Sequence, residues 1–153
     1  MAWVASALGS VHLLGLAIGP GAVLVRAWAL RRVADGVERD AWVRRALMAD
    51  NLWGVAAVLW IGTGLLRVFG GWEKGSAYYL AAPAFHLKMT LLGLVLALEA
   101  WPMVTLIRWR VAGMRGGDPD VSRALTFARI SEVELAITLL MVVVAGWMAR
   151  GLP

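Results

Sequence analysis

The chain contains two histidines, His12 and His86, and both lie inside long apolar segments. An ionisable side chain within a membrane-spanning helix is costly to bury, so such residues usually have a function. Each histidine is followed on its own helical face by small residues, with a glycine seven positions later in both cases. The small residues are Gly15 and Gly19 after His12, and Thr90, Gly93, Ala97 and Ala100 after His86. This pattern places an imidazole beside a strip of backbone that a flat ligand could approach closely.

Neutral imidazole is a common axial ligand of haem iron, so we expect a haem between two facing helices, with His12 and His86 as candidate ligands. The spacing does not decide whether one histidine or both bind the iron. Two other interpretations stay open. Small residues also let helices pack closely without any ligand, as Gly15 and Gly19 could do. A non-haem metal site would need further ligands, because two histidines leave its coordination shell incomplete.

The composition sets the class of protein that must position these residues. Of the 153 residues, 61% are hydrophobic and 16% are charged, whereas soluble domains have about half and about a quarter. The mean hydropathy of +0.73 agrees and argues against a soluble enzyme or a disordered chain. About 20 apolar residues cross a bilayer core as a helix. The sequence therefore predicts an all-α, integral membrane four-helix antiparallel bundle, a single domain over residues 1–153, with spans at about 3–30, 46–69, 83–109 and 124–149.

The net charge of +5 is explained by topology rather than by nucleic-acid binding. Arginines gather in the connections 31–49 and 108–124, while the connection 70–82 is aromatic and holds one basic residue, Lys74. Positive connections stay on the cytoplasmic side of a membrane. We therefore expect a multi-pass protein of the inner (plasma) membrane, with the N- and C-termini outside and with no nucleic-acid partner. The chain has no cysteine, so it forms no disulfide.

Other ionisable residues lie within or beside the spans. Lys88 is about 200° around the helix from His86; it and Arg67 could either snorkel to the outer interface or bind an acidic group of a ligand. Seven polar residues from all four spans gather toward the inner side: Arg26, Asp50, Asn51, Glu99, Arg129, Glu132 and Glu134. We expect them to pair, since an unpaired charge in hydrocarbon costs at least about 2.5 kcal/mol. Arg129 and Glu132 share a helical face. A structural ion-pair cluster and a proton path both stay open.

Three runs resemble a known family. Phe85–Met89 resembles the His-x-Lys signature of the HemJ-type protoporphyrinogen oxidases, which are four-helix membrane proteins that bind haem b. The runs Val11–Gly15 and Phe127–Glu134 are similar to their first and fourth helices. The whole chain looks closer to a bacterial family of predicted membrane proteins called domain of unknown function 2214, through Ala49–Gly54 and Trp101–Val104.

The resemblance implies one or more haem b groups and functional roles for Lys88, Arg129 and Glu132. The full set of expected cofactor-binding residues is His12, Gly15, Gly19, Arg67, His86, Thr90 and Gly93. The first hypothesis is a haem b membrane protein with a redox role toward a tetrapyrrole, a quinone or a redox partner. Whether it is an enzyme stays open. The alternative is a cofactor-free accessory or assembly subunit of a larger membrane complex; a homo-oligomer is compatible with either hypothesis.

Overall fold

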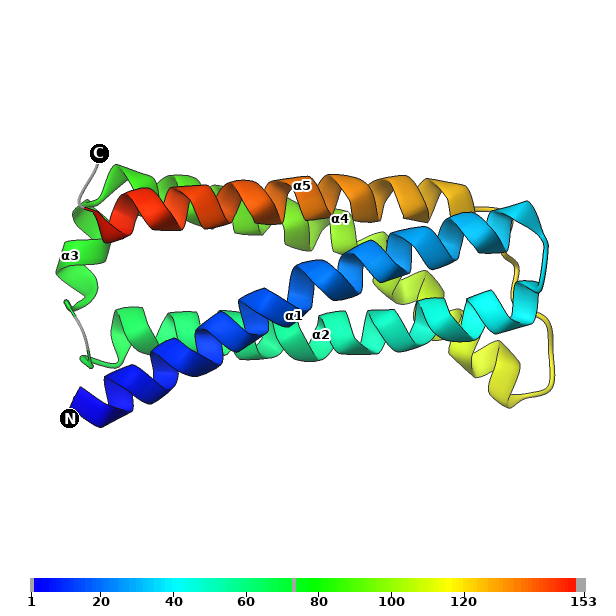
Figure 1. The fold of residues 1–153 in the computed structure, drawn as a ribbon, viewed down its shortest axis with the longest axis horizontal. Coiled ribbons are helices and arrows are strands. Elements are labelled where there is room, and N and C mark those ends of the chain that lie inside the picture. Colours follow the sequence, from blue (N-terminus) through cyan, green and yellow to red (C-terminus); the bar gives the residue numbers. More distant parts are fainter. Residues whose placement is uncertain (1, 73, 151–153) are drawn as a thin grey trace.

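The computed structural model describes residues 2–72 and 74–150, and every regular element in them is helical. The helices are α1 (Ala2–Asp35), α2 (Arg39–Phe69), α3 (Ser76–Ala81), α4 (Pro83–Met114) and α5 (Ala124–Ala149) (Figure 1). The four long helices are all long and apolar enough to cross a membrane. Each expected span falls within one of them. The predicted all-α four-helix architecture is thus confirmed.

The long helices run antiparallel, so the bundle has two distinct ends (Figure 1). The start of α1 and the end of α5 lie at one end, which we call the terminal end, and the short α3 lies across it. The connections 36–38 and 115–123 lie at the opposite end, which we call the loop end. The first of them turns sharply because Gly36 and Glu38 both have positive φ angles, of 80° and 50°.

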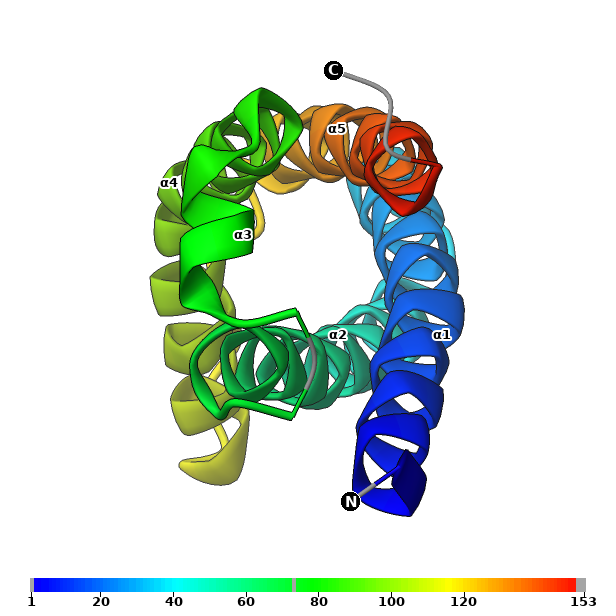
Figure 2. The same ribbon diagram turned by 90° about the vertical axis from the view of Figure 1, so that its left-hand side faces the viewer.

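Around the bundle the order of the helices is α1, α2, α4, α5, so that α1 and α4 lie on opposite sides (Figure 2). Helix α1 runs obliquely. Near the terminal end it packs on α2, where His12 contacts Trp60, and near the loop end it reaches α5, where Arg31 binds Glu132. This crossing separates α1 and α2 from α4 and α5 at the terminal end (Figure 1).

The loop end is the closed end of the bundle. Its core contains fully buried Leu30, Leu106 and Phe127, together with Trp42 and Trp109, so all four long helices contribute to it. The buried apolar cluster of the terminal half is smaller: Trp60, Ala84, Leu91, Met141 and Val144. Tight packing is therefore confined mainly to the loop end, and the terminal end has room between its helices.

The small residues of α1 are used for packing against α2. A Cβ atom on Gly15 would lie 3.1 Å from the carbonyl oxygen of Ala56 and 3.2 Å from the backbone nitrogen of Trp60. A Cβ atom on Gly19 would lie 3.0 Å from the ring of Trp53. Both glycines are buried. Their absent side chains let the two backbones approach closely, as in other membrane helix pairs.

The small-residue stripe of α4, unlike the buried glycines of α1, is exposed. All five of its members are exposed: His86, Thr90, Gly93, Ala97 and Ala100. A Cβ atom on Gly93 would meet no atom within 4 Å. The structure therefore does not place the two histidine stripes face to face, because the stripe of α4 lies on the outer surface of the bundle.

The packing of Gly15 gives a first test. We expect Gly15→Val to lower the free energy of unfolding by about 1–3 kcal/mol, because the new side chain meets the backbone of α2. The matched control is Gly21→Val in the same helix, where nothing lies within 4 Å of a new Cβ atom. Thermal unfolding in detergent measures both variants. Equal midpoints for the two would contradict this account of α1–α2 packing.

Candidate functional site

A cavity of about 790 Å³ opens at the terminal end of the bundle. Small-molecule sites in proteins have volumes of this size. Side chains from all five helices line it, and most of them are apolar, among them Leu16, Ile61, Phe85, Met89, Leu92, Met141 and Val142. The cavity lies where the oblique course of α1 separates the two helix pairs.

The charged residues among the described lining residues of this cavity are cations. Arg67, Lys74 and Lys88 line it, and no described lining residue is an aspartate or a glutamate. Lys74 donates a hydrogen bond of 3.0 Å to the Tyr78 hydroxyl. The Lys88 ammonium lies 6.0 Å from the centroid of the Trp60 ring. A cation in an apolar cavity favours a ligand that carries an acidic group.

His12 lies in the wall of the cavity and is held by two hydrogen bonds. The indole Nε1–H of Trp60 donates to His12 Nε2 over 3.0 Å. This leaves the proton of a neutral imidazole on Nδ1, which donates to Thr63 Oγ1 over 3.0 Å, and the Thr63 hydroxyl donates in turn to the Leu59 carbonyl. The network thus assigns the tautomer with its lone pair on Nε2.

His86 lies elsewhere. Its side chain is exposed on the outer surface of α4, where Nε2 donates a hydrogen bond of 2.8 Å to the Leu80 carbonyl of α3. Thr90 donates to the backbone carbonyl of His86.

Of the seven expected cofactor-binding residues, two line the cavity, namely His12 and Arg67. Sequence reasoning missed Thr63, and it missed the hydrogen bond from Trp60 to His12. Trp60 and Thr63 lie three positions apart on one face of α2.

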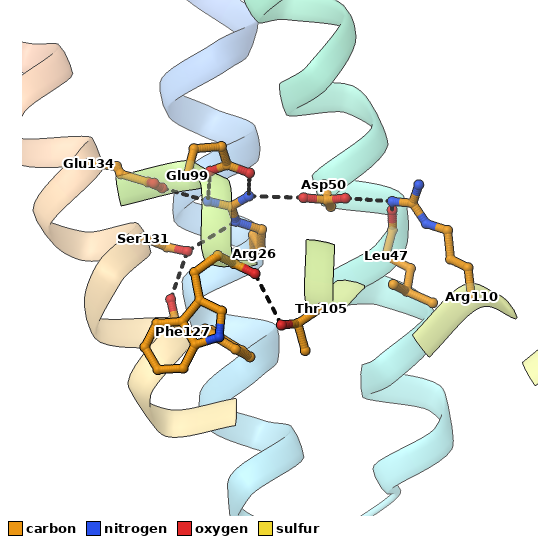
Figure 3. Close-up of polar contacts among 10 residues, drawn as sticks. Arg26, Leu47, Asp50, Glu99, Thr105, Arg110, Phe127, Ser131 and Glu134 are labelled. Carbon is orange, nitrogen blue, oxygen red and sulfur yellow. Dashed lines mark hydrogen bonds and ion pairs between the residues drawn. The ribbon is translucent and has the colours of Figure 1, made fainter. Parts of the chain in front are cut away.

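A second polar feature lies between the cavity and the loop-end core. We call it the charge cluster: Arg26, Asp50, Glu99, Arg110 and Glu134, drawn from all four long helices (Figure 3). At its centre is Arg26, whose side chain is 0% exposed.

Arg26 uses every N–H group it has. Its Nη1 donates to Asp50 Oδ1 at 2.9 Å and to Glu99 Oε1 at 2.7 Å. Its Nη2 donates to Glu99 Oε2 at 2.7 Å and to Glu134 Oε2 at 2.5 Å. Its Nε donates to the Ser131 hydroxyl at 3.0 Å. A guanidinium has five N–H donors in a fixed plane, so the helices around Arg26 must keep one relative arrangement to satisfy them.

The sequence predicted part of this cluster. Four of the seven polar residues expected to pair belong to the cluster, and the other three, Asn51, Arg129 and Glu132, lie outside it. Glu132 is held by Arg31 through two hydrogen bonds of 2.6 and 2.7 Å, rather than by Arg129. Arg110 was not expected; it binds Asp50 Oδ2 at 2.6 Å. Its position near the end of α4, in an arginine-rich run, gave no signal that it turns inward.

Of the three expected functional residues, Lys88 lines the cavity, and Arg129 and Glu132 do not.

Among the residues that the structure describes, no three histidine, cysteine, aspartate or glutamate side chains come together as a set that could hold a metal ion. A haem differs from such a site in needing only axial ligands from the protein.

Comparison with known proteins gives one match. The model of a family described as "Predicted membrane protein (DUF2214)" matches residues 4–153. No curated protein and no solved structure matches the chain. The family description agrees with the four long apolar helices and assigns no activity.

The centre of the charge cluster gives a second test. Arg26→Met would leave three buried carboxyl groups without their shared cation, and we expect a loss of at least about 3 kcal/mol in the free energy of unfolding. The control is Arg31→Met, which removes a pair whose side chains are 46% and 41% exposed; such pairs contribute about 0–1 kcal/mol. Unfolding in detergent measures both. A loss for Arg26→Met no larger than for Arg31→Met would refute the central role of Arg26.

Proposed function

The chain belongs to the DUF2214 family of predicted membrane proteins, and we propose that it binds haem b in the terminal-end cavity and has a redox role in the inner (plasma) membrane. One observation carries the proposal. The same apolar cavity of about 790 Å³ is lined by the imidazole of His12, whose Nε2 carries the lone pair, and by the ammonium of Lys88. The resemblance to the HemJ-type oxidases supports it from the sequence.

The residues of the cavity fit the chemistry of haem. Histidine ligands of metals usually donate their second ring N–H to a fixed acceptor, which orients the ring. Thr63 is such an acceptor for Nδ1 of His12. Binding through Nε2 requires the indole of Trp60 to release that nitrogen. Arg67 and Lys88 would meet the propionates, and the apolar walls would exclude water. Haem, when bound, supplies one-electron redox chemistry that the side chains lack.

The proposal gives the two histidines different roles. His12 is the protein ligand, while His86 on the outer surface is not. With a single histidine ligand, oxidation of a bound substrate, such as a tetrapyrrole or a quinone, is favoured over electron transfer alone. Lys88 is then the residue placed to bind an acidic group of that substrate or of the cofactor. The glycines of α1 support the site indirectly, by packing α1 on α2.

A second candidate is a cofactor-free accessory subunit of a larger membrane complex. The exposed stripe of α4 supports it, since small residues on an outer helix face permit close approach of another helix. The two candidates differ in whether the purified protein contains haem.

Spectroscopy separates the candidates. We expect protein produced with added haem precursor and purified in detergent to show a b-type reduced-minus-oxidised spectrum and about one haem per chain as the pyridine haemochrome. His12→Ala should lose most of this haem, because the imidazole that would bind the iron is gone. His86→Ala is the matched control and should keep it. Folding of each variant is checked by circular dichroism and by elution from a sizing column.

Each outcome of that experiment is informative. Haem-free wild-type protein would refute the proposal and favour the accessory subunit. Haem retained by His12→Ala but lost by His86→Ala would place the ligand on the outer surface of α4 and away from the cavity.

The cations of the cavity give a fourth prediction. In titrations of haem-free protein, Lys88→Gln and Arg67→Gln should each weaken haem binding by about 1.5–3 kcal/mol, the contribution of a hydrogen bond to a charged group. The same variants should bind haem dimethyl ester as wild type does, because the ester has no carboxylate. Arg129→Gln, outside the cavity, is the control for both ligands. An equal loss for haem and for its ester would contradict the pairing with propionates.

A further inference from the structure

The charge cluster contains more negative than positive groups. Its cations are Arg26 and Arg110, and its carboxyl groups are Asp50, Glu99 and Glu134. If all were ionised, one negative charge would remain without compensation among buried and half-buried side chains. Uncompensated charge in a low-dielectric interior is costly, and proteins usually remove it by binding a proton.

The three carboxyl groups differ in how well they are paired. Asp50 binds both arginines, one through each of its oxygens. Glu99 forms a two-bond pair with Arg26. Glu134 has one bond to Arg26; its side chain is 0% exposed, and its Oε1 has no hydrogen-bond partner among the described residues. A fully buried carboxylate oxygen without a donor is the least stable of the three sites for a negative charge.

The position of Glu134 adds repulsion. Its Oε2 and Glu99 Oε2 bind the same nitrogen, Arg26 Nη2, at 2.5 and 2.7 Å. Two oxygens on one nitrogen are close neighbours, and two carboxylates at such a distance cannot both be ionised easily. The groups that face Glu134 from the helices packed on α5 are Arg26 of α1 and Glu99 of α4, with Asp50 and Arg110 beyond them.

We propose that the charge cluster is a proton-binding site, in which Glu134 holds one proton at neutral pH and so makes the cluster neutral. The site is separate from the proposed haem cavity, because none of its five residues lines that cavity. The proposal therefore does not depend on haem binding. It gives the buried cluster a ligand, a single exchangeable proton, in addition to its role in packing.

Infrared spectroscopy of the purified protein tests the proposal. In a detergent without carbonyl groups, at pH 7 in D₂O, wild type should show the C=O stretch of one protonated carboxyl group, since exposed carboxyl groups are ionised at that pH. Glu134→Gln should abolish the band. The control Glu132→Gln, in a pair on the bundle surface, should retain it. Wild-type protein without the band, or a band that persists in Glu134→Gln, would overturn the proposal.

Stability gives an independent readout. A neutral glutamine should replace a protonated Glu134 with a change in thermal midpoint within about 3 °C. Asp50→Asn should lower the midpoint by about 10 °C, because it leaves two arginines short of a carboxylate. Raising the pH should remove the proton and lower the wild-type midpoint, but should have little effect on Glu134→Gln in the same range. Equal losses for Glu134→Gln and Asp50→Asn would show that Glu134 is ionised and overturn the assignment.

Discussion

The buried guanidinium of Arg26 fixes how the four long helices are arranged. Helices in a bilayer gain little from burying apolar surface against one another, because lipid is equally apolar. Directional polar contacts and close backbone packing must then fix how they are arranged. Arg26 requires acceptors from α2, α4 and α5 at the same time. An alternative rotation of any of these helices would leave a charge unpaired in a medium without water, which is far more costly than a change in apolar packing.

This constraint also explains where the cavity lies. At the level of Arg26 the helices are drawn together, and toward the loop end they close around Phe127 and Leu106. Toward the terminal end the described residues form no second charge cluster, the buried apolar cluster around Trp60 is smaller, and Gly15 packs α1 against α2. The two helix pairs therefore separate there, and the space between them becomes the cavity. His12 lies in its wall because the packing of α1 on α2 places that side chain against Trp60 and Thr63.

The sequence predicted what depends on local properties and failed where the surroundings decide. Four helices follow from segment length and hydropathy, and the pairing of Arg26 with carboxylates follows from the cost of a lone charge. The sequence does not show whether the His86 stripe faces into the bundle or outward. These helices are apolar on all sides, and small residues suit a lipid-facing surface as well as a helix contact. Thr63 and Arg110 were missed for a related reason: a threonine in an apolar helix and an arginine in a basic run have ordinary local explanations, and only their partners on other helices reveal their roles.

The cavity and the charge cluster are related by a single electrostatic argument. Each contains ionisable groups in an apolar setting, and the sign of their charge favours a ligand of the opposite sign. In the cavity, the ammonium of Lys88 favours an acidic group on the proposed ligand. The cluster has one carboxyl group more than it has cations, so its ligand must be positive and small enough for a fully buried position beside Glu134. A proton meets that requirement without further space. In a chain with so few ionisable residues, the charge and the burial of these side chains are what lead to both proposed sites.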